Sequence, residues 1–411
     1  MDDGRVSGDE VGDGDLPLLI RVYGQDRPRV TSDLLQLLGD SGAVLEDMEQ
    51  LVVRERLTLD VLVRLGGADD SLLRDILYWG FTHDLRIEFE RVEARSRRAQ
   101  LVRHAVTVLG RPLPATALAA VADAISATGG NIDRVVRLAT TPVTAYDLVV
   151  IAGDVEAMRR RLVEVARDHG LDVAVQVNGL ERRAKRLVVM DVDSTLIVDE
   201  VIELLAEEAG RLPEVAAITG RAMAGELDFE GSLRERVRLL AGLDQAAVAR
   251  VRDRIRLTPG ARTFVRTLQR LGFTVGIVSG GFTPFTDWLR ADLGLDYAFA
   301  NGLAVADGVL TGEVAGPVVD RAAKARLLTE IAAAEGVPLS QTVAVGDGAN
   351  DLDMLAAAGL GIAFNAKPVV RAQADTTVSV PYLDAILFML GIRGSDVDRD
   401  AEEPLASADP A

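Results

Sequence analysis

Four short, almost wholly apolar segments lie in the second half of the chain, at residues 186–190, 274–278, 342–345 and 360–363. Helical patterns separate them. Apolar runs of this length, without alternating polar residues, are typical of strands that are buried on both faces of a parallel sheet. Because parallel strands need crossover connections, the pattern predicts an α/β domain over residues 185–393.

Two further segments refine this prediction. Residues 199–257 are amphipathic and helical and contain no apolar strand, so we expect a helical cap inserted at about 199–262. Residues 297–313 predict a β-hairpin, with Asp307 and Gly308 at its turn. The expected fold class is therefore α/β, a Rossmann-like doubly wound parallel sheet with a helical cap insertion.

The first half of the chain shows a different pattern, which occurs twice. Strand and helix patterns follow the order βαββαβ over residues 16–95 and again over 96–180. Turn glycines, Gly24 and Gly110, follow the first strand of each copy and lie 86 residues apart. We interpret the two copies as duplicated ferredoxin-like domains, joined to the second half of the chain by a short basic connector.

Composition excludes several kinds of chemistry. The chain has no cysteine, so disulfides, thiolate metal sites and cysteine nucleophiles are excluded. Its three histidines, His83, His104 and His169, all lie in the first half, so the second half must rely on carboxylates, hydroxyls, lysine and a hard metal ion.

Charge points away from nucleic acid and anionic membranes. The net charge is −18 over 411 residues, and acidic residues crowd both ends, where we expect disordered tails at 1–15 and 394–411. Neither a basic patch nor an apolar run long enough to cross a membrane is present in the sequence. We expect a cytoplasmic protein.

Polar residues follow three of the four apolar segments. Asp191 and Asp193 come after the first, Ser279 and Gly280 after the second, and Asp347 after the third. Ligands of open α/β sheets bind at the carboxyl ends of the strands. Carboxylates gathered at one edge repel each other, so this arrangement predicts a bound Mg²⁺.

These segments carry a close resemblance to a known superfamily. DVDSTLIVDE (191–200), the strand ending in SGG (279–281), Lys324 and GDGANDLDML (346–355) resemble the four motifs of the haloacid dehalogenase-like superfamily. MAGELDFEGSLRERV (223–237) and DYAFAN (296–301) narrow the resemblance to the phosphoserine phosphatase family. It covers about residues 185–392.

The first half resembles paired ACT domains, which bind amino acids. The resemblance rests on the turn GQDRP (24–28) followed by VTSDLLQLL (30–38). Family turns carry a glycine where this chain has Arg29, and the second turn, GRPLP (110–114), lacks the acidic residue. The resemblance implies an amino-acid effector such as serine near Gly24 and Gly110, and a homodimer formed through these domains.

The resemblance also implies a reaction and its catalytic residues. The reaction is hydrolysis of O-phospho-L-serine to L-serine and phosphate through an aspartyl-phosphate, the last step of L-serine biosynthesis. Asp191 is the implied nucleophile, Asp193 the acid and base, and Lys324 the cation beside the phosphoryl group. The implied Mg²⁺ ligands are Asp191, the Asp193 carbonyl and Asp347, with Asp351 orienting the bound waters.

Substrate contacts are implied at the cap and at the strand ends. Glu200 faces the substrate ammonium and Arg236 its carboxylate, although Arg236 stands in a charged run, RERVR, where exposed arginine is common. The remaining implied contacts cover the substrate or bind its phosphate: Met223, Phe229, Ser279, Gly280, Lys324 and Asn350.

Alternatives remain open at this stage. An aspartyl-phosphate can pass to an alcohol such as homoserine instead of water, which would make the protein a phosphotransferase. Phosphatases of this superfamily also act on other phospho-amino acids or on phosphoproteins. A third alternative is a non-enzymatic amino-acid sensor that retains the phosphatase fold, but the presence of Asp191, Asp193, Lys324 and Asp347 argues against it.

Overall fold

The computed structural model describes residues 17–66, 70–92, 102–151, 153–179, 182, 184–374 and 376–398. The chain divides into two compact units, residues 1–101 and 102–411. The predicted tail at 1–15 lies outside the described residues. None of the described helices is both long and apolar enough to cross a membrane.

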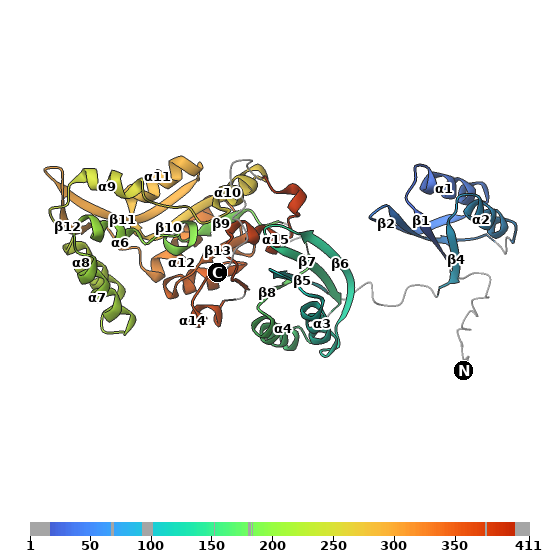
Figure 1. The fold of residues 1–411 in the computed structure, drawn as a ribbon, viewed down its shortest axis with the longest axis horizontal. Coiled ribbons are helices and arrows are strands. Elements are labelled where there is room, and N and C mark those ends of the chain that lie inside the picture. Colours follow the sequence, from blue (N-terminus) through green and yellow to red (C-terminus); the bar gives the residue numbers. More distant parts are fainter. Residues whose placement is uncertain are drawn as a thin grey trace, which may run out of the picture. The chain divides into compact units, whose positions relative to one another are not determined.

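The first unit is a ferredoxin-like domain, as predicted. Its antiparallel sheet has the strand order β2-β3-β1-β4 (Figure 1). Alternate residues of β3 are buried, and they pack with Leu34 and Leu38 of α1 and Ile76 of α2 in one core. The elements are β1 (Leu18–Gln25), α1 (Val30–Asp40), β2 (Val44–Val53), β3 (Arg56–Arg64), α2 (Asp70–Thr82) and β4 (Arg86–Arg91).

Two features of this domain bear on its function. Strand β2 lies at the edge of the sheet, and all ten of its residues are exposed, including Val44 and Leu51, each more than 60% exposed. Arg29, at the position where ACT turns carry glycine, has φ +79°. This left-handed conformation favours glycine, so Arg29 has a strained backbone at this turn.

The second ferredoxin-like domain repeats this topology. Its sheet order is β6-β7-β5-β8, which matches the first sheet strand for strand and supports the predicted duplication (Figure 1). The elements are β5 (Arg103–Gly110), α3 (Ala115–Ser126), β6 (Asn131–Ala139), β7 (Thr144–Ile151), α4 (Val155–His169) and β8 (Asp172–Val177).

A seven-stranded sheet forms the centre of the remaining part of the second unit. The order is β12-β11-β10-β9-β13-β14-β15, and every pairing is parallel except that of β12 with β11. The predicted fold class is confirmed, as is the hairpin. The strands are β9 (Leu187–Met190), β10 (Thr274–Phe282), β11 (Tyr297–Ala306), β12 (Val309–Ala315), β13 (Thr342–Gly346), β14 (Gly361–Phe364) and β15 (Thr376–Val378).

Helices cover the sheet and form the cap. Those of the sheet are α10 (Ala261–Arg270), α11 (Thr283–Leu293), α12 (Arg321–Ala334), α13 (Leu352–Ala357), α14 (Pro368–Arg371) and α15 (Ile386–Met389). The cap contains α6 (Val201–Glu208), α7 (Leu212–Met223), α8 (Phe229–Arg238) and α9 (Gln245–Arg252).

The two linkers that join the cap to the sheet are paired with each other. Ile197 forms an antiparallel bridge with Leu257, and Asp199 forms an ion pair with Arg256 at 2.6 Å. The cap therefore ends near 257. The predicted boundary at 262 is too late, because α10 already packs on β10 of the sheet.

The second ferredoxin-like domain and the catalytic domain share a core. Leu109, Val143 and Ala174 belong to the same buried apolar cluster as Ile386 and Leu387 of the catalytic domain. Hydrogen bonds cross the boundary too: Gln176 Nε2 donates to the Met389 carbonyl at 2.9 Å, and Ser379 N–H donates to Asp172 at 2.8 Å. Residues 102–398 therefore form one packed body.

Arg182, in the connector, reinforces this junction. Its guanidinium makes two hydrogen bonds of 2.9 Å to the Asp147 carboxylate of β7 and one of 2.9 Å to the Thr107 hydroxyl of β5. Its other face packs near Gly391, after α15. The connector was predicted to be a short basic linker, and the structure shows that one of its arginines is a buried anchor.

The C-terminal tail begins later than predicted. Residues 394–398 were expected to be disordered, yet they pack against α10. Arg270 donates to the Asp396 carbonyl, and Asp398 N–H donates to the Thr267 hydroxyl at 3.0 Å. The rest of the predicted tail, beyond 398, lies outside the described residues.

Replacing Arg182 by methionine tests the junction. R182M leaves Asp147 half-buried without its cation, and we expect the free energy of unfolding to fall by about 3–5 kcal/mol. Urea denaturation followed by tryptophan fluorescence measures it. R167M removes an exposed arginine and serves as the control. Equal small losses in both variants would contradict the assignment of Arg182 as an anchor.

Candidate active site

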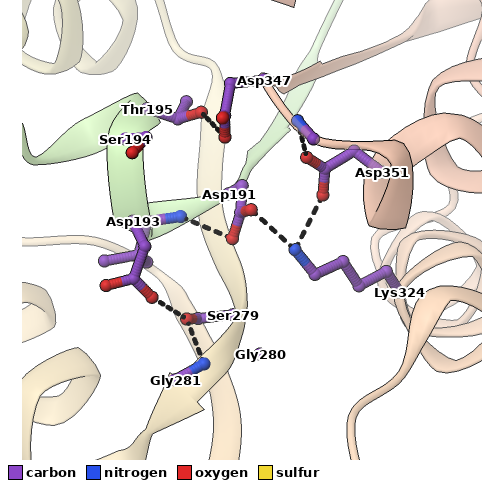
Figure 2. Close-up of polar contacts among 12 residues, drawn as sticks. Asp191, Asp193, Ser194, Thr195, Ser279, Gly280, Gly281, Lys324, Asp347 and Asp351 are labelled. Atoms are coloured by element: carbon purple, nitrogen blue, oxygen red, sulfur yellow. Dashed lines mark hydrogen bonds and ion pairs between the residues drawn. The ribbon is translucent and has the colours of Figure 1, made fainter. Parts of the chain in front are cut away.

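The site is built at the carboxyl end of β9, the central strand. All four residues of β9 are buried, and it pairs with β10 on one side and β13 on the other. Asp191 follows directly and is 4% exposed. One of its carboxylate oxygens accepts a hydrogen bond from Val192 N–H at 2.7 Å, so its position is fixed by its own turn (Figure 2).

Lys324 lies fully buried beside Asp191. It comes from α12, whose N-terminal capping residue is Asp320. Its ammonium lies 2.8 Å from Asp191 and 2.7 Å from Asp351 (Figure 2). Burial lowers the pKa of Lys324, but the two carboxylates more than offset burial and hold the pKa above its ordinary value. Lys324 is therefore a permanent cation with no exposed surface.

Three carboxylates converge around this lysine. Asp191, Asp347 and Asp351 each bring an oxygen to within 4.8 Å of the others. Burial, followed by the charge of Asp351, raises the pKa of Asp191 well above its ordinary value and that of Asp347 to about 7. One ammonium does not compensate three carboxylates. A divalent cation with hard oxygen ligands fits this donor set.

Asp351 differs from the other two in its contacts. Its second oxygen accepts a hydrogen bond from Gly348 N–H at 2.9 Å while the first binds Lys324, and the side chain is fully buried. The sequence predicted that Asp351 orients metal-bound water. The structure gives it a direct contact with the lysine, which sequence reasoning missed.

Asp193 lies on the other side of the turn, next to Ser279. One carboxylate oxygen accepts a hydrogen bond from Val201 N–H at 2.8 Å. The other accepts a hydrogen bond from the Ser279 hydroxyl at 3.3 Å (Figure 2). Burial, followed by the charge of Glu200, raises the pKa of Asp193 to about 6. A carboxyl group with this pKa has both its acid and its base form available near neutrality.

The turn after β10 faces this carboxyl group. Gly281 N–H donates to the Ser279 hydroxyl at 2.8 Å, which fixes the serine side chain. A side chain at Gly280 would approach the Phe229 ring to 3.1 Å, so the cap lies directly over this glycine. The structure therefore brings the predicted cap residue Phe229 to the predicted phosphate-binding turn.

The other predicted cap residues have mixed outcomes. Glu200 is exposed, and its carboxylate accepts a hydrogen bond from the Ser194 hydroxyl at 2.8 Å. The backbone of Ser194 is in a left-handed conformation, with φ +56°. Burial lowers the pKa of Arg236, and Glu200 and Asp193 oppose that effect, so all three share one electrostatic environment. Asn350 is half-buried beside Asp351. The Met223 side chain lies outside the described part of the structure.

The two predicted effector positions lie far from this chemistry in the sequence. Gly110 is the last residue of β5, and Gly24 is the next-to-last residue of β1, so both lie in strands and not in the turns after them. Gly24 lines a cavity of about 530 Å³ in the first unit, together with Arg56, Asp84 and Arg86. The cavity therefore presents both cations and an anion to a small ligand.

Comparisons with known proteins agree with this geometry. Residues 188–356 match the haloacid dehalogenase-like hydrolase family, and residues 17–90 and 102–176 each match ACT domain families. A phosphoserine phosphatase of Streptomyces coelicolor is 54% identical over 387 residues, which cover 93% of this chain and 94% of that protein.

The chain belongs to the phosphoserine phosphatase family. A phosphoserine phosphatase of Mycobacterium tuberculosis is 48% identical over 392 residues, again covering 93% of this chain and 94% of the relative. The crystal structure of a probable phosphoserine phosphatase from Vibrio cholerae aligns with a TM-score of 0.57 at 35% identity, covering 72% of this chain and 88% of that one. The predictions of a phosphoserine phosphatase enzyme and of paired ACT domains are confirmed.

Several contacts of this phosphoserine phosphatase fold were not predicted from the sequence. The Thr258 hydroxyl donates to the Thr195 carbonyl at 2.7 Å, and the Thr195 hydroxyl donates to Asp347 at 3.3 Å. Asp199 pairs with Arg256 across 57 residues. No local pattern marks such partners, because each pair joins distant parts of the chain.

Proposed function

We propose that the protein hydrolyses O-phospho-L-serine to L-serine and phosphate, the last step of L-serine biosynthesis, with Asp191 as nucleophile and Mg²⁺ as cofactor. The observation that carries the proposal is the contact between Asp191 and the fully buried Lys324. This cation opposes the effect of burial on the Asp191 carboxylate, and it attracts the phosphoryl group to the same point.

The proposed reaction has two displacements at phosphorus. An Asp191 oxygen attacks phosphorus, the bond to the serine oxygen breaks, and Asp193 gives its proton to that oxygen. Asp193 then takes a proton from water, whose oxygen attacks phosphorus as the bond to Asp191 breaks. Phosphate leaves and both carboxyl groups return to their first state. The pKa of Asp193, about 6, suits both transfers.

The metal site is assigned to the carboxylate cluster. Asp191, Asp347 and the Asp193 carbonyl would hold Mg²⁺, and Asp351 would orient water around it. The ion supplies positive charge that offsets the negative charge of the phosphoryl oxygens. Gly280 N–H would donate a hydrogen bond to the same oxygens, and so would the Ser279 hydroxyl once its proton turns from Asp193 to the bound phosphoryl group.

Substrate selection is assigned to the cap. Glu200 binds the ammonium and Arg236 the carboxylate of phosphoserine, while Met223, Phe229 and Asn350 complete the enclosure. The contact of Phe229 with Gly280 supports this arrangement, since it brings the cap directly over the phosphate-binding turn.

We also propose an effector and an oligomeric state for the ACT domains. The mixed charges of the cavity at Gly24 suit a small zwitterion such as serine, and a titration of L-serine followed by calorimetry measures its binding.

The exposed edge strand β2 offers unpaired backbone groups and apolar side chains to a second copy, so we propose a homodimer, which light scattering tests. A cytoplasmic location is in keeping with the lack of cysteine.

Phosphate release tests the reaction, the metal and the nucleophile together. We expect release from O-phospho-L-serine with Mg²⁺, and release at background level in D191N or after chelation with EDTA, because each change removes a group that the displacement needs. D253N, a change on the exposed end of α9, is the control and should keep wild-type activity.

Parallel substrates separate the alternatives. Phosphothreonine, a phosphopeptide and a sugar phosphate are assayed together with phosphoserine, and homoserine is added as a competing acceptor. Phosphohomoserine as a product would identify a phosphotransferase. Faster release from any of the other substrates than from phosphoserine would contradict the proposed specificity.

Arg236 and Arg234 form a matched pair for testing the cap. Both lie on α8, but Arg234 is exposed and pairs with Glu230, whereas Arg236 shares the electrostatic environment of Asp193 and Glu200. We expect R236M to raise KM for phosphoserine by about 100-fold, since it removes a charged hydrogen-bond partner of the substrate, and R234M to leave KM unchanged. Equal KM values in the two variants would exclude the carboxylate contact.

A further inference from the structure

Asn301 is a buried amide that none of the proposed steps uses. It lies on β11 next to Phe282 of β10 and has no exposed surface. Its Nδ2 donates to the Gly280 carbonyl at 2.8 Å, and its Oδ1 accepts from Val319 N–H at 2.8 Å. The Gly280 carbonyl needs a donor and the Val319 N–H needs an acceptor, so these two partners fix which way the amide of Asn301 is turned.

The first hydrogen bond fixes the turn that faces Asp193. In a planar trans peptide, the Gly280 carbonyl and the Gly281 N–H point in opposite directions. With the carbonyl held by Asn301, the N–H points to the Ser279 hydroxyl, 2.8 Å away. That hydroxyl therefore has its proton free to donate to Asp193 at 3.3 Å (Figure 2).

The second hydrogen bond fixes the start of α12. Val319 directly precedes Asp320, whose carbonyl accepts Lys324 N–H at 3.0 Å in the first turn of the helix. The position of Val319 therefore sets where Lys324 enters the site, one helical turn later. The ammonium at the end of that side chain contacts Asp191 at 2.8 Å.

We propose that Asn301 is a positioning residue that holds the Ser279–Gly281 turn and the Lys324 helix at a fixed separation. One planar side chain spans the two segments, and each carries a group that faces a reacting carboxyl group. The proposal rests on the roles proposed above for Asp191, Asp193, Ser279 and Lys324. It adds a residue that touches neither substrate nor metal.

Replacing Asn301 by leucine separates the packing role of the side chain from its hydrogen bonding. N301L has a similar volume and retains packing, but it offers neither donor nor acceptor. We expect kcat on phosphoserine to fall about 100-fold with KM nearly unchanged, because the substrate is still held by the cap while the reacting groups are displaced.

A core variant controls for lost stability. V265A removes buried methyl groups from α10. Val265 lies in the core cluster that contains Phe282, the register partner of Asn301, but on a helix that carries no site residue. At a temperature where both variants are folded, V265A should keep the wild-type kcat. An N301L rate that falls only in proportion to its unfolded fraction would overturn the proposal, and so would a wild-type kcat in N301L.

Hydrogen exchange gives a readout that does not depend on the reaction. Amide exchange in N301L should quicken at 279–282 and 318–324 and stay unchanged in the cap and in 102–177. Unchanged exchange at the two segments would overturn the proposal. If only the proposed function is wrong, the wild-type protein will lack activity on phosphoserine, but its amides at 279–282 and 318–324 will still exchange slowly.

N301D keeps the proposal testable if N301L does not fold. It preserves the shape and the acceptor for Val319, but only its acid form can donate to Gly280. Its kcat relative to wild type should fall as pH rises. A ratio of one at every pH would overturn the proposal.

Discussion

A single buried ammonium makes the active site possible. Lys324 has no exposed surface, and it contacts Asp191 and Asp351 at 2.8 and 2.7 Å. Burial of carboxylates without a partner costs several kcal/mol each, so without this cation the acidic residues at the strand ends would be protonated or the fold would open. The lysine thus offsets part of the cost of burying the carboxylates around it.

The sheet topology decides which residues can gather around that lysine. Because β9 lies between β10 and β13, the polar residues after these three strands meet at one edge. The apolar strands and the residues after them could be predicted from the sequence, since both depend on local pattern. The resemblance of the motifs then assigned a role to each of Asp191, Asp193, Ser279 and Asp347.

Contacts between distant segments could not be predicted in this way. Asn301 joins residues 280 and 319, and although the motif DYAFAN ends in it, nothing in that motif indicates which segments the amide contacts. Asp199 and Arg256 meet because the two cap linkers pair, and neither has a charge pattern that distinguishes it from a surface residue. The cap boundary was misplaced for a related reason. The sequence of α10 is amphipathic, and an amphipathic pattern does not tell whether a helix packs in the cap or, as α10 does, on the sheet.

The shared core of residues 102–398 affects how inactive variants of this enzyme are interpreted. Leu109 and Ala174, from the second ACT domain, pack in the same cluster as residues of the catalytic sheet. A substitution there can abolish activity by loosening the catalytic domain, with no effector involved. Loss of function that maps to the second ACT domain is therefore no sign of regulation by itself.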